Sequence, residues 1–238
     1  MKKSVLCLVI MLLLSASCLI NRLEENETTI YLQKNRNGTP ITIKVTKGPH
    51  WTNIHKMGPF KANVLPQIVV WIERRDAKFI DTLYITGAYS KPKSHMGKLS
   101  KGTLFWKEYF PAWSVRMVSA DKKLPLEENA DFDAVTSATP QSSFTLNTKL
   151  LSNTEPFVLY VELNKSTDTN AVFTEENYEW VGQPSIIYSC EIASTKGGIE
   201  YTLKPIGYGD INKENSINHD LTNIDTALKI IKEIKVSF

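Results

Sequence analysis

Apolar and polar residues alternate in short runs bounded by glycine, proline and asparagine, a pattern typical of β-strands. Two of these runs, Thr28–Lys34 and Thr39–Lys47, are separated by Arg36-Asn37-Gly38. Asn-Gly readily supplies the positive φ angles of a tight turn, so the two runs are predicted to pair as a hairpin.

A second hairpin is predicted from Gln67–Arg74 and Lys78–Thr86, which are joined by Arg75-Asp76-Ala77. Its first strand is largely apolar on both faces, with Ile68, Val70 and Ile72 on one and Val69, Trp71 and Glu73 on the other. Such a strand is expected at the centre of a sheet, covered on both sides.

Further elements follow from the same patterns. Strands are predicted at Ser143–Lys149, Phe157–Leu163, Ser185–Ile192, Glu200–Leu203 and over the last residues Ile234–Phe238. One C-terminal helix is predicted at Asn223–Lys232, where Ile224, Ala227, Leu228 and Ile231 recur at helical spacing. A shorter helix is predicted at Thr103–Tyr109, ending before Pro111.

Many short strands with turns between them favour a two-sheet sandwich in a mainly β fold. No internal repeat or low-complexity linker divides the chain, so residues 28–238 are predicted to form one domain. Two segments, Lys47–Asn63 and Lys91–Ala134, lack a regular pattern and are expected to be long loops.

The N-terminal segment has the layout of an export signal. Lys2 and Lys3 precede the apolar run Val5–Leu14, and small residues then lead to Cys18. The run is shorter than the roughly 20 residues that span a bilayer. Residues 1–17 are therefore predicted to be a signal peptide and residues 18–27 a tether. The small residues before Cys18 resemble the lipobox of bacterial lipoproteins, which implies lipidation of Cys18 in the periplasm or on the outer surface. The alternative is an ordinary signal peptide that is cleaved after Ser17 or nearby, with no role for Cys18.

Charge and cysteine content follow from this export prediction. The whole chain has 28 basic and 25 acidic side chains. Cleavage removes Lys2 and Lys3, so the mature part is close to neutral and nucleic acid is not an expected partner. Cys190 is then the single cysteine of the folded part, which excludes an intramolecular disulfide. It lies in an apolar run, as a buried strand thiol would.

The irregular segment Lys91–Ala134 is rich in aromatic residues, among them Trp106, Tyr109 and Trp113. These rings could form a stacking platform for a sugar or another planar ligand. They could equally be the core of a long crossing loop. Both interpretations are open from the sequence.

One hairpin carries a family resemblance. Val70-Trp-Ile-Glu73, followed by Lys78-Phe-Ile-Asp-Thr-Leu-Tyr-Ile85, resembles the W-I-E-D hairpin of a family of predicted periplasmic proteins of unknown function. The resemblance extends from about residue 64 to the C-terminus, and Ala77 stands where the family tends to have glycine. It continues through Trp113, Asp131-Phe-Asp133, Asp133–Pro140, Tyr160–Asn164, Gly182–Ser185 and Pro205–Gly207. The resemblance implies an immunoglobulin-like sandwich and an association with flavin-attachment systems.

Asp133-Ala-Val-Thr136-Ser137-Ala138-Thr139 is similar to the D-x-x-[ST]-G-A-T motif of covalent flavin-binding domains. The resemblance implies that the Thr139 hydroxyl could carry FMN, with Asp133 and Thr136 as supporting residues. Ser137 replaces the glycine of the motif, and serine strains a turn that needs positive φ. The same residues could instead form a hydroxyl-bonded turn before the next strand.

Other catalytic signatures are not found. The sequence has no G-x-S-x-G, H-E-x-x-H, C-x-x-C or phosphate-binding glycine loop. The four histidines are scattered, and the acidic run Glu127–Asp133 lacks the spacing of an EF-hand. No metal site is therefore predicted.

Two functional hypotheses follow. The first is a lipid-anchored, non-enzymatic protein that binds or scaffolds other components of the cell envelope. The second is an electron-transfer accessory that carries FMN on Thr139 and works with envelope redox proteins. A hydrolytic enzyme ranks third, because no acid–base or nucleophilic pair can be assembled.

Lipidation of Cys18 can be tested directly. Cells expressing the full chain and given radiolabelled palmitate should label the protein, and Cys18→Ser should abolish the label. Cys190→Ser is the matched control and should keep it. Label that survives in Cys18→Ser would exclude this anchor.

Overall fold

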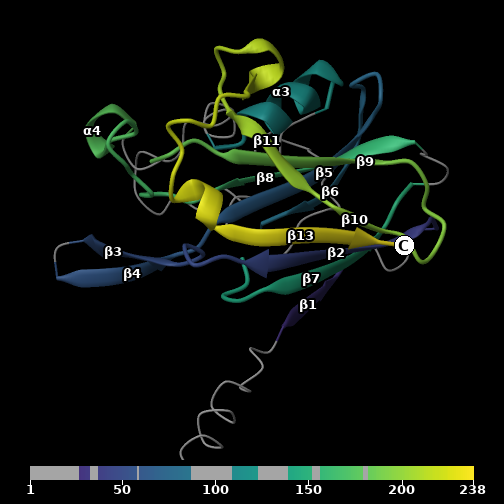
Figure 1. Ribbon diagram of the computed structural model, residues 1–238, viewed down its shortest axis with the longest axis horizontal. Coiled ribbons are helices and arrows are strands. Elements are labelled where there is room, and N and C mark those ends of the chain that lie inside the picture. Colours follow the sequence, from purple (N-terminus) through teal and green to yellow (C-terminus); the bar gives the residue numbers. More distant parts are fainter. Residues whose placement is uncertain are drawn as a thin grey trace, which may run out of the picture.

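The computed structural model describes residues 27–32, 37–57, 59–86, 109–122, 139–151, 156–178 and 182–238. Their strands form two larger sheets that lie face to face, and a two-stranded hairpin that extends to one side (Figure 1). The fold is mainly β, as the alternating pattern predicted. Within the described residues, no helix has the length and apolar character needed to cross a membrane.

The first sheet has the strand order β1-β7-β2-β13-β10. Its strands are β1 (Thr28–Tyr31), β2 (Pro40–Lys47), β7 (Phe144–Lys149), β10 (Glu200–Thr202) and β13 (Ile231–Ser237). All neighbours pair antiparallel except β1 and β7, which are parallel.

The second sheet has the order β12-β11-β9-β8-β5-β6 and is antiparallel throughout. Its strands are β5 (Gln67–Arg74), β6 (Phe79–Ile85), β8 (Phe157–Asn164), β9 (Ile186–Ile192), β11 (Lys204–Gly209) and β12 (Ile217–Asn218). The remaining elements are β3 (Asn53–Met57), β4 (Phe60–Val64), α3 (Pro111–Ser119), α4 (Glu175–Tyr178) and the 3₁₀ turns η1 (Glu214–Ser216) and η2 (Ala227–Lys229).

A single apolar core joins the facing sides of the two sheets. The first sheet contributes Ile43 and Val236, and the second contributes Val70 and Val161, all almost completely buried. Alternation in β2 and β5 puts these side chains on the inner face and drives the sheets together by the burial of apolar surface.

The outer face of the second sheet is covered as well, by α3 (Figure 1). Val69 and Trp71 of β5 pack there against Phe110, Trp113 and other residues near the helix. The prediction that β5 is central and buried on both faces is therefore confirmed. The helix begins at Pro111, whose fixed φ suits the first helical position.

Two carboxylates lie buried beneath α3. Glu162 of β8 accepts hydrogen bonds from the backbone N–H groups of Ala112 (3.3 Å) and Trp113 (2.9 Å), and from the Ser185 hydroxyl (2.6 Å). It thereby caps the helix N-terminus, where backbone N–H groups lack partners. Burial nevertheless raises the pKa of Glu162 to about 7.

The second buried carboxylate, Glu73 of β5, forms an ion pair with Arg116 of α3. It also accepts a hydrogen bond from the Trp71 indole at 2.6 Å. Arg116 lies over the ring of Tyr160, which stacks on Trp71. Burial raises the pKa of Glu73, and the Arg116 charge opposes this shift.

The first predicted hairpin is wrong. β1 does not pair with β2, because β7 lies between them. Phe144 and Leu146 of β7 are core residues, and the whole of β7 pairs with Pro40–Val45. The Asn-Gly signal describes a local turn and carries no information about a strand inserted from 100 residues away.

The predicted helix at Asn223–Lys232 is also wrong. This segment forms only the 3₁₀ turn η2 before β13 begins at Ile231. The apolar spacing matches both structures, since Ile224, Ala227 and Ile231 are buried in the core. β13 takes the C-terminal half because it completes the first sheet. The predicted closing strand is confirmed and starts three residues earlier.

The other predicted strands and the β5–β6 hairpin are confirmed, and its connection has Ala77 at a φ of 61°. Most of the predicted Thr103–Tyr109 helix lies outside the described residues. The sequence did not predict α3, β3, β4, β11 or β12.

The Glu162 carboxylate should make stability depend on pH. Its pKa is raised in the folded state, so unfolding releases its proton between pH 4.5 and about 7. Its contribution to the free energy of unfolding is therefore full at low pH and declines as pH rises through this window. Denaturant titrations of wild type and Glu162→Gln should show the wild type losing stability relative to the variant from about pH 4.5 to about 7. For the control Glu175→Gln, at an exposed position of α4, the difference in unfolding free energy from the wild type should not change with pH. A flat Glu162 difference would contradict the prediction.

Candidate functional site

The β3–β4 hairpin projects from one end of the molecule, separate from both larger sheets (Figure 1). Its register pairs Asn53 with Val64 and Met57 with Phe60. Within the described part of the chain neither strand pairs with a third, so each keeps an unpaired edge. An isolated two-stranded hairpin is marginally stable in water, so its base has to be held.

Residues 48–52 lead into β3 and residues 65–66 lead out of β4, and we call them the first and second legs of the hairpin. The segment that precedes β7 is bonded to both legs. The buried Trp51 donates from its indole Nε1 to the carbonyl of Pro140 at 3.0 Å and packs against Phe144. On the other leg, the Thr139 hydroxyl donates to the carbonyl of Pro66 at 2.5 Å. Two adjacent residues, Thr139 and Pro140, therefore hold the two ends of the hairpin.

The first leg is also bonded to the turn before β13. The N–H of Gly48 donates to the Ile230 carbonyl at 2.7 Å, and that of His50 donates to the Lys229 carbonyl at 3.1 Å. A Cβ at position 48 would stand 2.1 Å from the Lys229 carbonyl oxygen. Glycine is therefore required for this close approach.

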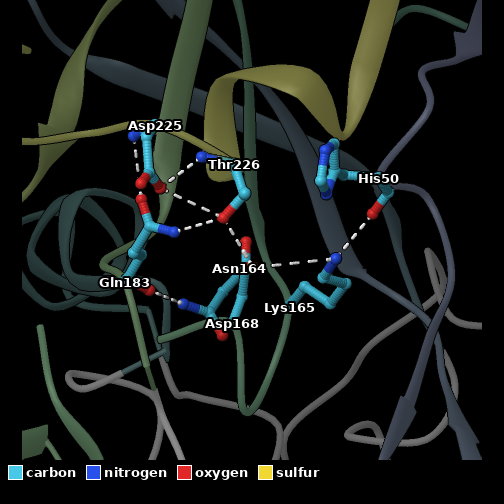
Figure 2. A network of polar contacts seen from close by, with 7 residues as sticks. All are labelled: His50, Asn164, Lys165, Asp168, Gln183, Asp225 and Thr226. Atoms are coloured by element: carbon cyan, nitrogen blue, oxygen red, sulfur yellow. Dashed lines mark hydrogen bonds and ion pairs between the residues drawn. The ribbon is translucent and has the colours of Figure 1, made fainter. Parts of the chain in front are cut away.

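A buried polar cluster lies behind this leg (Figure 2). Lys165 follows β8 and is 2% exposed, and its Nζ donates to the His50 carbonyl at 2.6 Å. The same Nζ lies 3.9 Å from a carboxylate oxygen of Asp168. Burial lowers the pKa of Lys165, and the Asp168 charge opposes this shift.

The cluster extends through Gln183 and Thr226. The Thr226 hydroxyl donates to Asp168 at 2.7 Å and is itself an acceptor for Gln183 Nε2 at 2.5 Å. Gln183 Oε1 accepts from the N–H of Asp225, and its backbone carbonyl accepts from Asn164 Nδ2 (Figure 2). Loops that follow β8, precede β9 and precede β13 are thus tied together beside the hairpin.

The backbone around the cluster adopts positive φ angles, which are strained at Thr167 and need glycine at position 182. Thr167 has a φ of 63°, which is rare for a β-branched residue. Gly182 has a φ of 71°, and a Cβ there would stand 2.7 Å from the Asp168 nitrogen. Oxygen atoms of Asn164, Thr167 and Asp168 are buried and have no hydrogen-bond partner among the described residues. These features reduce the free energy of unfolding, so the arrangement of the cluster is kept at the expense of stability.

The polar groups of the cluster hold neighbouring loops together. Lys165 and Asp168 compensate each other's charge, and the amide and hydroxyl groups are bonded to neighbouring loops. In the described ranges, no three Asp, Glu, His or Cys side chains gather as metal ligands would. The arrangement can hold loops in register and transmit rigidity to the hairpin.

The sequence-predicted flavin residue is part of this base. Thr139 is 4% exposed, and its hydroxyl donates to Pro66 rather than facing solvent. Transfer of FMN to this oxygen would require the hydroxyl to leave its bond and the turn to open. Asp133, Thr136, Trp106 and Cys18 lie outside the described residues.

Of the three predicted aromatic ligand-binding residues, Tyr109 and Trp113 belong to the core beneath α3. Both are buried, and their polar atoms bond to Ser166 and Thr82 respectively. Neither ring offers a face for stacking, so the structure agrees with the core interpretation. Cys190 lies partly buried in β9, and burial raises its pKa to about 12, which keeps the thiol protonated at neutral pH.

The residues of the polar cluster were missed as site residues. Two segments quoted for the family resemblance, Tyr160–Asn164 and Gly182–Ser185, do meet in the cluster, through the bond from Asn164 to the Gln183 carbonyl. A lysine next to an apolar strand gave no reason to expect burial, because Lys165 becomes buried only when three distant loops close over it.

The charge pair in the cluster should be energetically coupled. Lys165→Met keeps the length of the side chain but leaves Asp168 buried without its cation, and should cost about 3–5 kcal/mol of unfolding free energy. Adding Asp168→Asn should recover about 1–3 kcal/mol of that loss. Urea titrations of the two single variants and the double variant measure this coupling. Lys196→Met, at an exposed position, should change stability by less than about 0.5 kcal/mol. Additive losses would show that the pair does not interact.

No protein-family model, curated protein or solved structure matches this chain. The resemblance to periplasmic proteins with a W-I-E-D hairpin therefore stays a prediction.

Proposed function

We propose that the protein is an exported, lipid-anchored binding module of the cell envelope that docks through its β3–β4 hairpin. The observation that carries the proposal is the contrast between the two ends of this hairpin. Its base is held by Trp51, Thr139 and Lys165, whereas its strands pair only with each other in the described chain. Elements fixed at the base and unpaired at the edges suit strand addition or surface docking.

The exposed groups of the hairpin support this role. Ile54 is 61% exposed, and Lys61 and Asn63 are exposed on the opposing strand. Single exposed apolar side chains are common on protein surfaces, so the proposal depends on the strand edges beside Ile54, which are unpaired within the described residues, and not on the exposure of Ile54 alone. Beneath the hairpin, the two sheets would act as an immunoglobulin-like scaffold, a fold that presents loops and hairpins at its ends.

Export and anchoring are supported by the sequence alone. Val5–Leu14 and Cys18 supply the signal and the lipid site of the proposal. The binding role is preferred to catalysis because the buried charged groups form structural bonds, Glu162 to the α3 backbone and Lys165 to His50. A flavin carrier would need Thr139, which fastens the second leg.

Site-specific crosslinking tests the docking role. A photoreactive amino acid placed at Ile54 in the lipidated protein should give discrete adducts, with a protein or with lipid, when native membranes are irradiated. The matched control is Ile211, which is 60% exposed in the loop before η1 and should give none. Equal adducts from both positions, or none from Ile54, would contradict docking through the hairpin.

The same preparation decides the flavin alternative. Intact mass and visible absorbance of the purified protein should show no FMN, because the Thr139 hydroxyl is buried and bonded. An added FMN mass that Thr139→Ala abolishes would replace the proposed role by electron transfer.

A further inference from the structure

The chain around the hairpin has an unusual charge distribution. Residues 28–72 contain no aspartate or glutamate. The basic residues of this stretch are Lys34, Arg36, Lys44, Lys47, Lys56 and Lys61, with His50 and His55 in addition. A mature chain that is nearly neutral overall therefore gathers positive charge in its first quarter.

On the hairpin this charge is not neutralised from within. Lys56 and Lys61 stand opposite each other in the β3–β4 register, and neither strand contains an acidic residue. Like charges directly opposed across two strands destabilise the pairing. By contrast, Lys44 in β2 forms an ion pair with Glu27 at 2.9 Å. The two strands thus carry two lysines and no acidic residue, next to the exposed Ile54.

The predicted lipid anchor at Cys18 would place the domain close to a membrane, which makes the membrane surface a candidate partner of the hairpin. Nine residues separate Cys18 from Thr28, and an extended chain of this length spans about 30 Å. A lipidated chain would therefore hold the domain within about one domain diameter of the membrane. At that distance the membrane surface is present at a high effective concentration, because binding becomes intramolecular.

We infer that the β3–β4 hairpin rests on the anionic headgroups of the membrane that carries the lipid anchor, so that the domain has a fixed orientation on it. The inference rests on the proposed anchoring and docking role, and it names the surface. Lys56 and Lys61 supply the attraction to phosphate groups, and Ile54 enters the headgroup layer.

Hydrogen exchange on the lipidated protein tests the inference. The purified protein is reconstituted in vesicles of phosphatidylcholine alone and in vesicles that also contain phosphatidylglycerol. Amides of residues 53–64 should exchange at least about fivefold more slowly on the anionic vesicles, which corresponds to about one lysine at a membrane surface. The protection should disappear at high salt, since salt screens charges beyond a few ångströms.

A matched pair of variants separates the hairpin from charge in general. Lys56→Gln/Lys61→Gln should remove the protection, whereas Lys196→Gln/Lys213→Gln, which removes two exposed lysines elsewhere, should keep it. Unchanged exchange in β5 would show that each variant is folded. Equal exchange on the two kinds of vesicle would overturn the inference.

The outcomes also separate this inference from the proposed function. If the Ile54 probe captures an envelope protein while anionic vesicles give no protection, the docking role stands and the lipid surface is excluded. If the Ile54 probe gives no adducts and the anionic vesicles give no protection, both the docking role and the membrane contact are excluded.

Discussion

The structure depends on the burial of β5 and β8 on both of their faces. The inner face joins the core between the sheets, and the outer face carries Glu73 and Glu162, which are fully buried. Two buried carboxylates are costly unless cations or N–H groups meet them. α3 supplies both, through Arg116 and through the backbone N–H groups of its first turn. The helix therefore meets the polar groups of the strands beneath it, although burial still raises the pKa of Glu162.

The same constraint acts at the end of β8. Asn164 and Lys165 emerge from a strand that is already buried, so their polar groups have to find partners inside the protein. Lys165 finds the His50 carbonyl and Asp168, and Asn164 finds the Gln183 carbonyl. These bonds draw together loops that are distant in sequence. As a result, the end of the central strand also fixes the base of the β3–β4 hairpin, with no disulfide among the described residues.

The sequence predicted the parts of this design that depend on local pattern. Alternation placed β2, β5, β8 and β9 close to their observed bounds and predicted the double burial of β5. It failed where a distant segment decides the outcome: β7 enters between β1 and β2, and β13 replaces the predicted C-terminal helix. Pro111 was taken as the end of a helix, although it begins α3. The polar cluster was not predictable because the burial of Lys165 arises only when three loops meet around it.

In the proposed docking role, rigidity at the base of the hairpin and unpaired edges along it would serve the same recognition step. A hairpin ordered only on contact would lose conformational entropy when it binds, and this loss would reduce the affinity. Trp51, Thr139 and Lys165 already hold both legs before any contact is made. The strain at Thr167 and the unmatched buried oxygens nearby are therefore costs of folding rather than of binding. If the hairpin docks as proposed, little of the interaction energy of Lys61 and Ile54 would be lost to ordering it.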